Sequence, residues 1–111
     1  MKNKQEIKVI LKTLELLRDE TLWDKNAVFG EECDLENQKL TLGCALIKAQ
    51  KEIRGKVHNR SKEMGVVRRK IYFYYFWRAG IHPVTYFNRN RRTKYDDVIR
   101  VLQLSIQTLK T

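Results

Sequence analysis

The sequence of 111 residues has few of the features that mark secreted or membrane proteins. It contains only two cysteines, Cys33 and Cys44, and no apolar run approaches the roughly 20 residues that a membrane-spanning helix needs. Two cysteines are too few for the disulfide framework of a small secreted domain, so we expect both to be reduced thiols. The first residues lead into an amphipathic pattern rather than the apolar segment of a signal peptide. These absences predict a soluble, cytoplasmic protein without a membrane partner.

The chain also lacks the sequence motifs of common enzymes. It has no glycine-rich phosphate loop, no His-Glu-x-x-His helix and no Gly-x-Ser-x-Gly turn. The side chains with metal-ligating chemistry are Cys33, Cys44, His58 and His82. No two of them have the short spacing of a zinc module. Asp34, Glu36 and Lys39 have the residue types of a metal-dependent nuclease, but the strands that would carry them are not predicted. We therefore expect neither enzymatic activity nor a metal or cofactor.

Acidic residues are scarce in the second half of the chain. Residues 1–50 contain eight Lys or Arg and nine Asp or Glu, whereas residues 51–111 contain fifteen and four, so the net charges of the halves are −1 and +11. Phosphate neutralisation with release of counterions provides most of the affinity of proteins for nucleic acids. The basic half therefore favours a polyanionic partner. The alternative is that this charge only keeps the protein soluble.

Apolar periodicity predicts an all-α, single compact domain over residues 1–111 with about four helices. The first helix is expected at about residues 6–18, and its apolar positions at helical spacing are Ile7, Ile10, Leu11, Leu14 and Leu17. An ordered loop follows at residues 21–30, with Trp23 and Phe29 packed onto the core. The second helix ends near residue 54. Its small residues are Gly43, Cys44, Ala45 and Ala49. They allow the backbone of another helix to approach closely.

The third helix is expected at residues 62–79. Ser61 is placed to cap its start, and Gly80 and Pro83 lie beyond its end, where they stop a helix. Because aromatic residues favour strands, a buried strand over residues 71–77 is an alternative.

The last helix is expected to begin after a loop at residues 81–92. Thr93 and Asp96 have the spacing of a capping box, in which a hydroxyl and a carboxylate three residues apart bond the free amides of the first turn. The helix then continues to the end of the chain.

Six consecutive aromatic residues, from Tyr72 to Trp77, follow a basic triplet at residues 68–70. Rings that point all round a helix must be enclosed by neighbouring elements, by a partner or by both. We expect most of these rings to belong to the core. Alternatively, rings beside cationic groups could stack on nucleic-acid bases, and the candidates for stacking are Tyr72 and Phe76.

Basic side chains gather before and on the third helix and again before the last one. The candidate nucleic-acid or anion-binding residues are Arg60, Lys62, Arg68, Arg69, Lys70, Arg89, Arg91, Arg92 and Lys94. Arginine suits bidentate phosphate contacts, and the last group precedes a helix N-terminus, where amides and dipole attract anions. An alternative is that Asp96 or Asp97 pairs with Arg91 or Arg92 in a purely structural network.

Four short motifs stand along the chain: Trp23, the segment Thr-Leu-Gly-Cys-Ala-Leu-Ile-Lys-Ala at residues 41–49, Phe87-Asn88, and Arg92-Thr93 ahead of Asp97-Val98-Ile99. This pattern resembles a family of small helical proteins of unknown function from bacteria and their phages. Cys44 stands where that family has a glycine, and residues 51–80 have no counterpart in it. The resemblance implies a helical fold and a bacterial or phage origin, and it implies no mechanism.

Charge, aromatic content and the missing catalytic motifs together predict a non-enzymatic binding protein. The favoured partner is nucleic acid or a nucleoprotein complex, held by the basic surface of the second half. One alternative is a protein-interaction module, such as a phage-encoded factor that occupies an acidic surface of a host machine. Another is a homo-oligomer formed through the aromatic helix.

Overall fold

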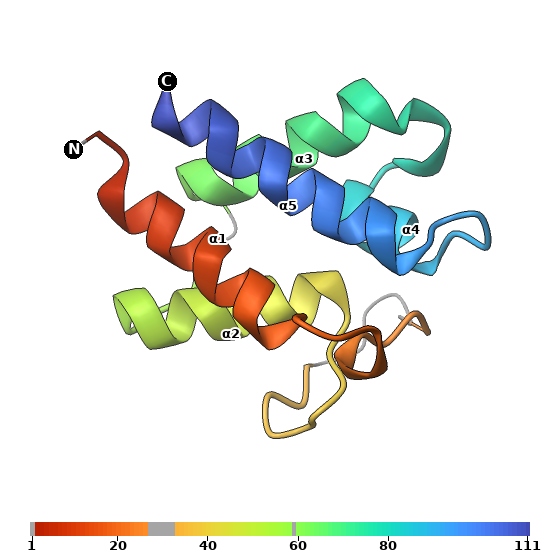
Figure 1. Ribbon diagram of the computed structural model, residues 1–111, viewed down its shortest axis with the longest axis horizontal. Helices are drawn as coiled ribbons and strands as arrows, with labels where there is room; N and C mark the ends of the chain where they lie inside the picture. Colours follow the sequence, from red (N-terminus) through yellow and green to blue (C-terminus); the bar gives the residue numbers. More distant parts are fainter. Residues whose placement is uncertain (1, 27–32, 59) are drawn as a thin grey trace.

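The described residues form five α-helices and two short 3₁₀ helices (Figure 1). A computed structural model describes residues 2–26, 33–58 and 60–111. The helices are α1 (Lys4–Leu16), η1 (Glu20–Leu22), α2 (Leu42–Arg54), α3 (Lys62–Tyr74), η2 (Phe76–Arg78), α4 (Pro83–Arg89) and α5 (Tyr95–Lys110). Across these ranges the only β pairing is an isolated bridge between Trp23 and Leu40. The all-α prediction is confirmed, with five helices instead of about four.

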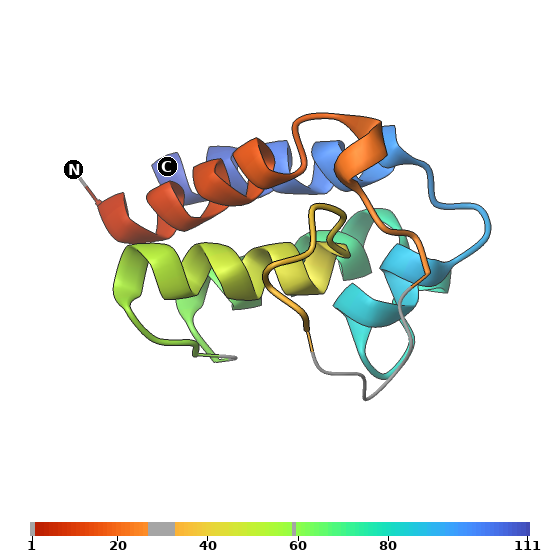
Figure 2. The ribbon, with the colours of Figure 1, turned by 90° about the horizontal axis from the view of Figure 1, so that it is seen from below.

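The helices pack in two layers. Helices α1 and α5 lie side by side in one layer, and α2, α3 and α4 form the other (Figure 2). Asn3 Nδ2 donates a hydrogen bond to the Leu109 carbonyl at 3.0 Å, so the two ends of the chain meet at one end of the molecule. No helix in the described part of the chain is both long and apolar enough to cross a bilayer.

The core comes from the periodic positions that the sequence indicates. In α1, Ile7 and Ile10 are buried as expected, whereas Leu11 is exposed and Val9 takes an inward position. Ala45 and Ala49 are fully buried on α2, which packs along α1. Small side chains at these positions let the two layers come together.

Side-chain caps fix the starts of α2 and α3. Thr41 Oγ1 accepts a hydrogen bond from the Cys44 amide at 3.1 Å, and Ser61 Oγ accepts one from the Met64 amide at 3.4 Å. These bonds satisfy amides that have no partner within the helix. The prediction that Ser61 caps the third helix is confirmed.

The third helix ends earlier than expected. It stops at Tyr74, because Tyr75 has φ −137° and ψ 44°, and η2 follows. Gly80 then reverses the chain at φ 58°, where a β-carbon would lie 2.8 Å from Tyr86 Cδ2, so this turn requires glycine. The expected helix over residues 62–79 was therefore too long, and the alternative strand over residues 71–77 is wrong.

A short helix occupies part of the expected loop over residues 81–92. Pro83 is the first residue of α4, where its fixed φ suits a helix and its missing N–H costs nothing. The prediction treated Pro83 only as a residue that ends helices, and this is why it missed α4.

The last helix begins one residue later than the predicted capping box requires. Lys94 is the N-cap of α5, and Asp97 Oδ2 accepts a hydrogen bond from the Lys94 amide at 2.9 Å. Thr93 is buried instead, and Asp96 is exposed. The predicted Thr93 and Asp96 pair was wrong because the aspartate one position later makes the capping bond.

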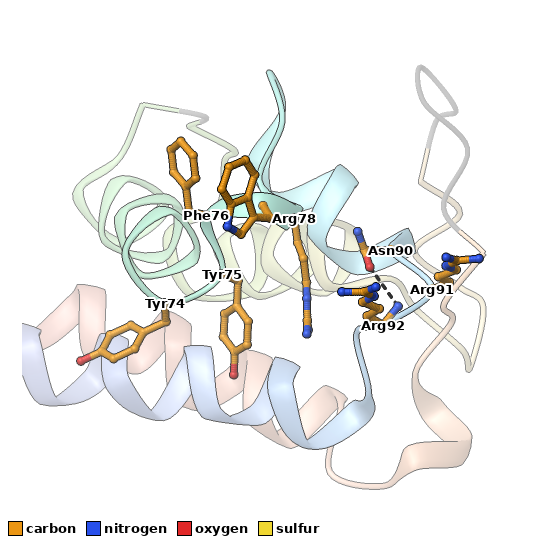
Figure 3. Close-up of a pocket in the computed structure, with 8 residues that line it drawn as sticks. Tyr74, Tyr75, Phe76, Arg78, Asn90, Arg91 and Arg92 are labelled. Carbon is orange, nitrogen blue, oxygen red and sulfur yellow. Dashed lines mark hydrogen bonds between the residues drawn. The ribbon is translucent and has the colours of Figure 1, made fainter.

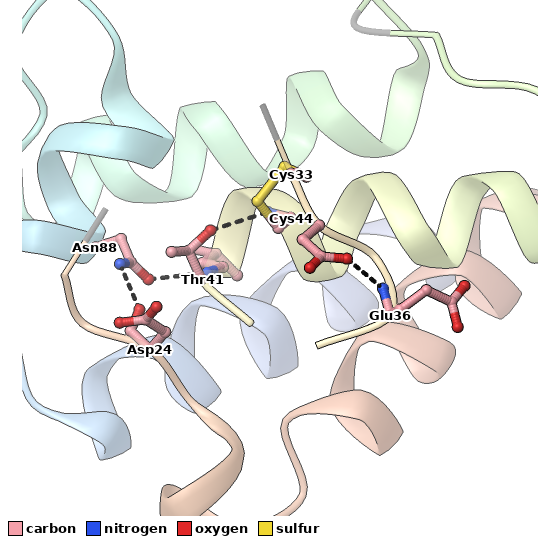
Figure 4. The surroundings of a disulfide bond; sticks show 8 residues. Asp24, Cys33, Glu36, Thr41, Cys44 and Asn88 are labelled. Atoms are coloured by element: carbon pink, nitrogen blue, oxygen red, sulfur yellow. Dashed lines mark hydrogen bonds between the residues drawn. A yellow bond between two sulfur atoms is a disulfide. The ribbon is translucent and has the colours of Figure 1, made fainter. Parts of the chain in front are cut away.

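Asn88 ties the loop after α1 to α2 and α4 (Figure 4). Its Oδ1 accepts hydrogen bonds from Trp23 Nε1 at 2.7 Å and from the Leu42 amide at 2.8 Å, and its Nδ2 donates to the carbonyls of Asp24 and Lys25. Trp23 is buried, as predicted for the loop. The predicted packing of Phe29 lies outside the described residues.

The two cysteines form a disulfide, so the prediction that both are reduced thiols was wrong (Figure 4). Leu40 returns to the segment after α1 through hydrogen bonds with Leu22 and Asp24, and this places Cys33 beside Cys44 in the first turn of α2. The sequence separation of 11 residues does not show that path.

A buried ion pair connects α2 and α3. The Glu63 carboxylate is fully buried and accepts hydrogen bonds from Arg54 Nε at 2.9 Å and Arg54 Nη2 at 3.1 Å. Gln50 Nε2 lies 3.4 Å from the same carboxylate and 2.6 Å from Ser61 Oγ. Arg54 also reaches Glu6 of α1 at 3.4 Å. These contacts hold one positive charge of the basic half inside the fold.

Candidate functional site

Most of the consecutive aromatic rings are exposed, so the expectation that they belong to the core was wrong. The side chains of Phe73, Phe76 and Trp77 are 79%, 61% and 92% exposed, and Tyr72 and Tyr74 are also exposed. Of the six rings only Tyr75 is packed against the core, with its ring centroid 4.9 Å from that of Phe87. For Phe76 and Trp77 the physical reason is the early end of α3, because the turn that follows directs Tyr75 inward and the next two rings outward.

Three of the exposed rings, those of Tyr74, Phe76 and Trp77, border a pocket of about 400 Å³ (Figure 3). One wall comes from the end of α3 and η2, and the other from the turn between α4 and α5. The residues that line it are Tyr74, Tyr75, Phe76, Trp77, Arg78, Asn90, Arg91 and Arg92. The pocket thus brings two of the predicted anion-binding arginines next to one of the predicted stacking residues, Phe76.

Asp97 of α5 anchors the aromatic wall. Arg78 Nη1 forms an ion pair with Asp97 Oδ2 at 3.1 Å, and the Tyr75 hydroxyl lies 3.2 Å from Asp97 Oδ1. The Arg78 guanidinium also lies 5.1 Å from the centroid of the Tyr75 ring. In Figure 3 Tyr75 and Arg78 point toward α5, whereas Phe76 points away from it. These contacts fix η2 and leave Phe76 free of the core.

We expect Asp97 to make the stability of this wall depend on pH. Partial burial raises the pKa of Asp97, but hydrogen bonds from Lys94, Arg78 and Tyr75 and the charge of Arg78 outweigh it, so its pKa lies below the ordinary 3.8. A carboxylate of this kind stabilises the fold above its unfolded pKa, and the stabilisation is lost as pH falls through the folded pKa. Asp97→Asn should therefore lower the free energy of unfolding by about 1 kcal/mol at pH 7 and by less below pH 4. Urea denaturation at pH 7 and pH 3 measures both, with the exposed Asp96→Asn as control.

The opposite wall is a hydrogen-bonded turn over residues 90–93. Asn90 Oδ1 accepts a bond from the Arg92 amide at 2.9 Å, and the Asn90 carbonyl accepts one from the Thr93 amide at 2.9 Å. Lys25 Nζ donates to the carbonyls of Asn90 and Thr93. Burial, followed by the charge of Arg78, lowers the pKa of Lys25. A lysine from the other half of the chain therefore holds the turn that presents Arg91 and Arg92.

Arg91 and Arg92 have no acidic partner in the described part of the chain. Both are exposed, and the ion pairs among described residues do not include them. The alternative that Asp97 pairs with either of them is not realised, because Asp97 pairs with Arg78. As far as the described residues show, two guanidinium groups that line the pocket meet no carboxylate that would compete with an anionic ligand.

The remaining candidate residues do not all join this site. Arg69 is exposed on α3, four residues before Phe73, so the two side chains are neighbours on one face of the helix. Arg68 instead lines a second pocket with residues 81–85. Arg89 is exposed, and its guanidinium lies 4.9 Å from the centroid of the Tyr86 ring.

The other predicted cations and the stacking candidate Tyr72 flank the site or lie far from it. Lys62 Nζ bonds Asn3 Oδ1 at 2.9 Å, at the end of the molecule where the termini meet, and Arg60 precedes that end of α3. Lys70 is half-buried in the middle of α3, and Lys94 is exposed at the start of α5. Of the stacking candidates, Tyr72 is exposed but its hydroxyl bonds the Gly80 carbonyl at 2.9 Å. The predicted residues thus do not form one surface.

Trp77 is the most exposed ring of the aromatic run, and the prediction of stacking residues did not include it. The prediction assumed one regular helix to residue 79, whereas α3 ends at Tyr74 and Trp77 lies on η2. The sequence held no signal for this, since Gly80 and Pro83 limit a helix only from about residue 79 onward.

Within the described residues no group of three or more His, Cys, Asp or Glu side chains is arranged to hold a metal ion. Comparison with family models, with curated proteins and with solved structures finds no match to this chain. The resemblance to small helical bacterial and phage proteins therefore stays a prediction, and the case for a function depends on the geometry of the site.

Proposed function

We propose that this protein is a non-enzymatic nucleic-acid-binding protein and that the pocket between η2 and the turn over residues 90–93 is its binding site. The observation that carries the proposal is the position of Arg91 and Arg92, both exposed and without acidic partners in the described chain, beside the exposed rings of Phe76 and Trp77. Nucleic acids offer phosphates to arginines and flat bases to aromatic rings.

Burial energetics support a partner of some kind at this surface. Fully exposed rings of this size lose the stabilisation that burial would give them, and monomeric proteins rarely expose large contiguous apolar patches without a functional reason. The fold encloses only Tyr75 of the six rings. The cost of exposing Phe73, Phe76 and Trp77 is best explained by a ligand that covers them.

Charge makes nucleic acid the favoured partner. Arg78 is neutralised by Asp97, and Arg54 by Glu63 and Glu6, so these cations contribute little to an external anion. Arg91 and Arg92 face the same pocket without such a neutralising contact. Among the described residues, the pocket therefore keeps two arginine charges for phosphates.

Replacing Arg91 and Arg92 together by glutamine is expected to weaken binding to a labelled hairpin with a single-stranded tail by at least about tenfold at low salt. Loss of two phosphate contacts should also make the slope of log affinity against log salt about 1–2 less steep. Fluorescence anisotropy at several salt concentrations measures both quantities, with RNA and DNA versions of the probe.

The matched control is Lys4→Gln with Lys8→Gln, which removes the same charge from exposed positions at the other end of the molecule. We expect this pair to change affinity by less than threefold. An equal loss from both pairs would mean that net charge alone drives binding, and binding that does not depend on salt would contradict the proposal.

A second candidate function is protein binding, including self-association. The observation that favours it is Ile81, an aliphatic side chain that is 83% exposed four residues after Trp77. Light scattering measures the mass in solution and so tests self-association. A dimer that dissociates on Ile81→Ser would place a second copy of the chain on this surface.

A further inference from the structure

We propose that the pocket selects single-stranded over double-stranded nucleic acid, with one base stacked on Trp77 and adjacent phosphates on Arg91 and Arg92. This inference rests on the proposed function and specifies its ligand. In a duplex the base faces are covered by neighbouring bases, so an exposed ring finds no surface to stack on. In a single strand each base has a free face.

The two exposed rings of η2 are arranged to receive a base from solvent. Trp77 and Phe76 meet edge to face, with ring centroids 5.3 Å apart and an interplanar angle of 77°. A pair in this arrangement cannot cover each other's faces, so at least one broad face of Trp77 is open, in agreement with its 92% exposure. Open faces of this kind serve as stacking platforms for bases.

The size of the pocket fits a single nucleotide unit. Its volume of about 400 Å³ lies at the lower end of the range for small-molecule sites, about 300–1,000 Å³. A duplex would meet this site through grooves and backbone, and the usual duplex readers insert a helix or a β-ribbon into a groove. Here the projecting groups are rings on a short turn.

The stacking surface continues past the pocket along α3. Phe73 is 79% exposed, and Arg69 lies four residues before it on the same helical face. A second base on Phe73, with a phosphate near Arg69, would extend the strand from Trp77 along the outside of α3. This predicts a footprint of a few nucleotides.

Trp77 provides its own reporter, because the only other tryptophan, Trp23, is buried. Titration of the protein with unlabelled single strands of 12 nucleotides should quench its fluorescence, whereas the matching 12-base-pair duplex should not. The dissociation constant for the single strand is expected to be at least about tenfold lower than for the duplex. DNA and RNA strands are tested in parallel, and tighter binding of one of them shows whether the site prefers deoxyribose or ribose.

Two substitutions at one position separate stacking from folding. Trp77→Ala should weaken single-strand binding by about tenfold, the effect expected for one lost stacking contact, and leave duplex binding unchanged. Trp77→Phe keeps a ring, so its affinity measured with a labelled strand should stay within about threefold while the quenching disappears. Because Trp77 is exposed, neither change is expected to alter the circular dichroism spectrum.

The outcomes distinguish this inference from the proposed function. Equal or tighter binding to the duplex, without a change in fluorescence, would overturn single-strand selection and leave nucleic-acid binding in place. Failure to bind either the single strand or the duplex would overturn both single-strand selection and the proposed function. If Trp77 instead responds only to vesicles of anionic phospholipid, the aromatic surface is a lipid-binding one, and both are likewise overturned.

Discussion

Replacing Arg54 by methionine is expected to lower the free energy of unfolding by about 3 kcal/mol. The fully buried Glu63 carboxylate would lose both hydrogen bonds from the guanidinium, and breaking a buried pair by removing one partner costs about 3–5 kcal/mol because an uncompensated charge stays buried. The lower end of this range applies because the Arg54 side chain is 24% exposed and water reaches part of the pair. Urea denaturation followed by circular dichroism measures the change.

Two controls separate the buried charge from lost packing. Arg54→Met combined with Glu63→Gln removes both charges, and we expect the double variant to recover at least about 1 kcal/mol relative to Arg54→Met. Glu6→Gln removes only the outer contact with Arg54 and should cost less than about 1 kcal/mol. If Arg54→Met and Glu6→Gln have the same small effect, Glu63 is not held by Arg54 in the manner described.

Replacing Asn88 by leucine, whose side chain has the same branching and number of non-hydrogen atoms, is expected to cost about 3 kcal/mol of stability. The indole N–H of Trp23 and the amide of Leu42 would lose their acceptor, and the carbonyls of Asp24 and Lys25 would lose their donor. An unsatisfied buried polar group costs about 1–3 kcal/mol, and in the native chain the described buried side-chain polar atoms all have partners. Thermal unfolding and the fluorescence of Trp23 report the loss.

The control for Asn88 is Trp23→Phe, which removes a single donor and keeps an aromatic ring in the core. Trp23→Phe should lower the free energy of unfolding by less than Asn88→Leu does. Asn88→Leu should also lower the affinity of the candidate site for nucleic acid. Asn88 holds the segment that carries Lys25, and Lys25 in turn bonds the turn over residues 90–93. An Asn88→Leu variant that binds nucleic acid with unchanged affinity would contradict this connection.

Periodic positions made the helices predictable. Ile7, Ile10 and Leu17 follow the helical period and are buried, and Ser61 caps the third helix, since these features depend only on residues close in sequence. The inward placement of Trp23 followed in the same way from one large apolar ring within a polar segment.

Features that depend on distant neighbours could not be predicted. The exposure of Trp77 follows from the dihedral angles of Tyr75, which in turn reflect its contacts with Phe87 and Asp97 from two other helices. The disulfide depends on how the segment before α2 returns to Leu22, and the Arg54–Glu63 pair on the crossing of two helices. These partners are far apart in the sequence, and only the folded chain brings them together.

The candidate site was predicted only in part, because its make-up also depends on residues that are distant in sequence. Its cations and its rings were both identified from composition, but the prediction grouped Lys62 with Arg91 although α3 separates them. A helix of 13 residues spans about 20 Å, so membership of one surface depends on which end of α3 a residue occupies.

The hydrogen bond between Asn3 and Leu109 has a practical meaning for any polypeptide attached to this domain. The two ends of the chain lie close together (Figure 1). Helix α5 is about 24 Å long and separates them from the pocket, which lies beyond its first turn. An affinity tag, fluorophore or neighbouring domain joined at either end would sit clear of a bound strand. A short peptide bridge could also join the two ends into a circular chain, with new ends opened in an exposed connection.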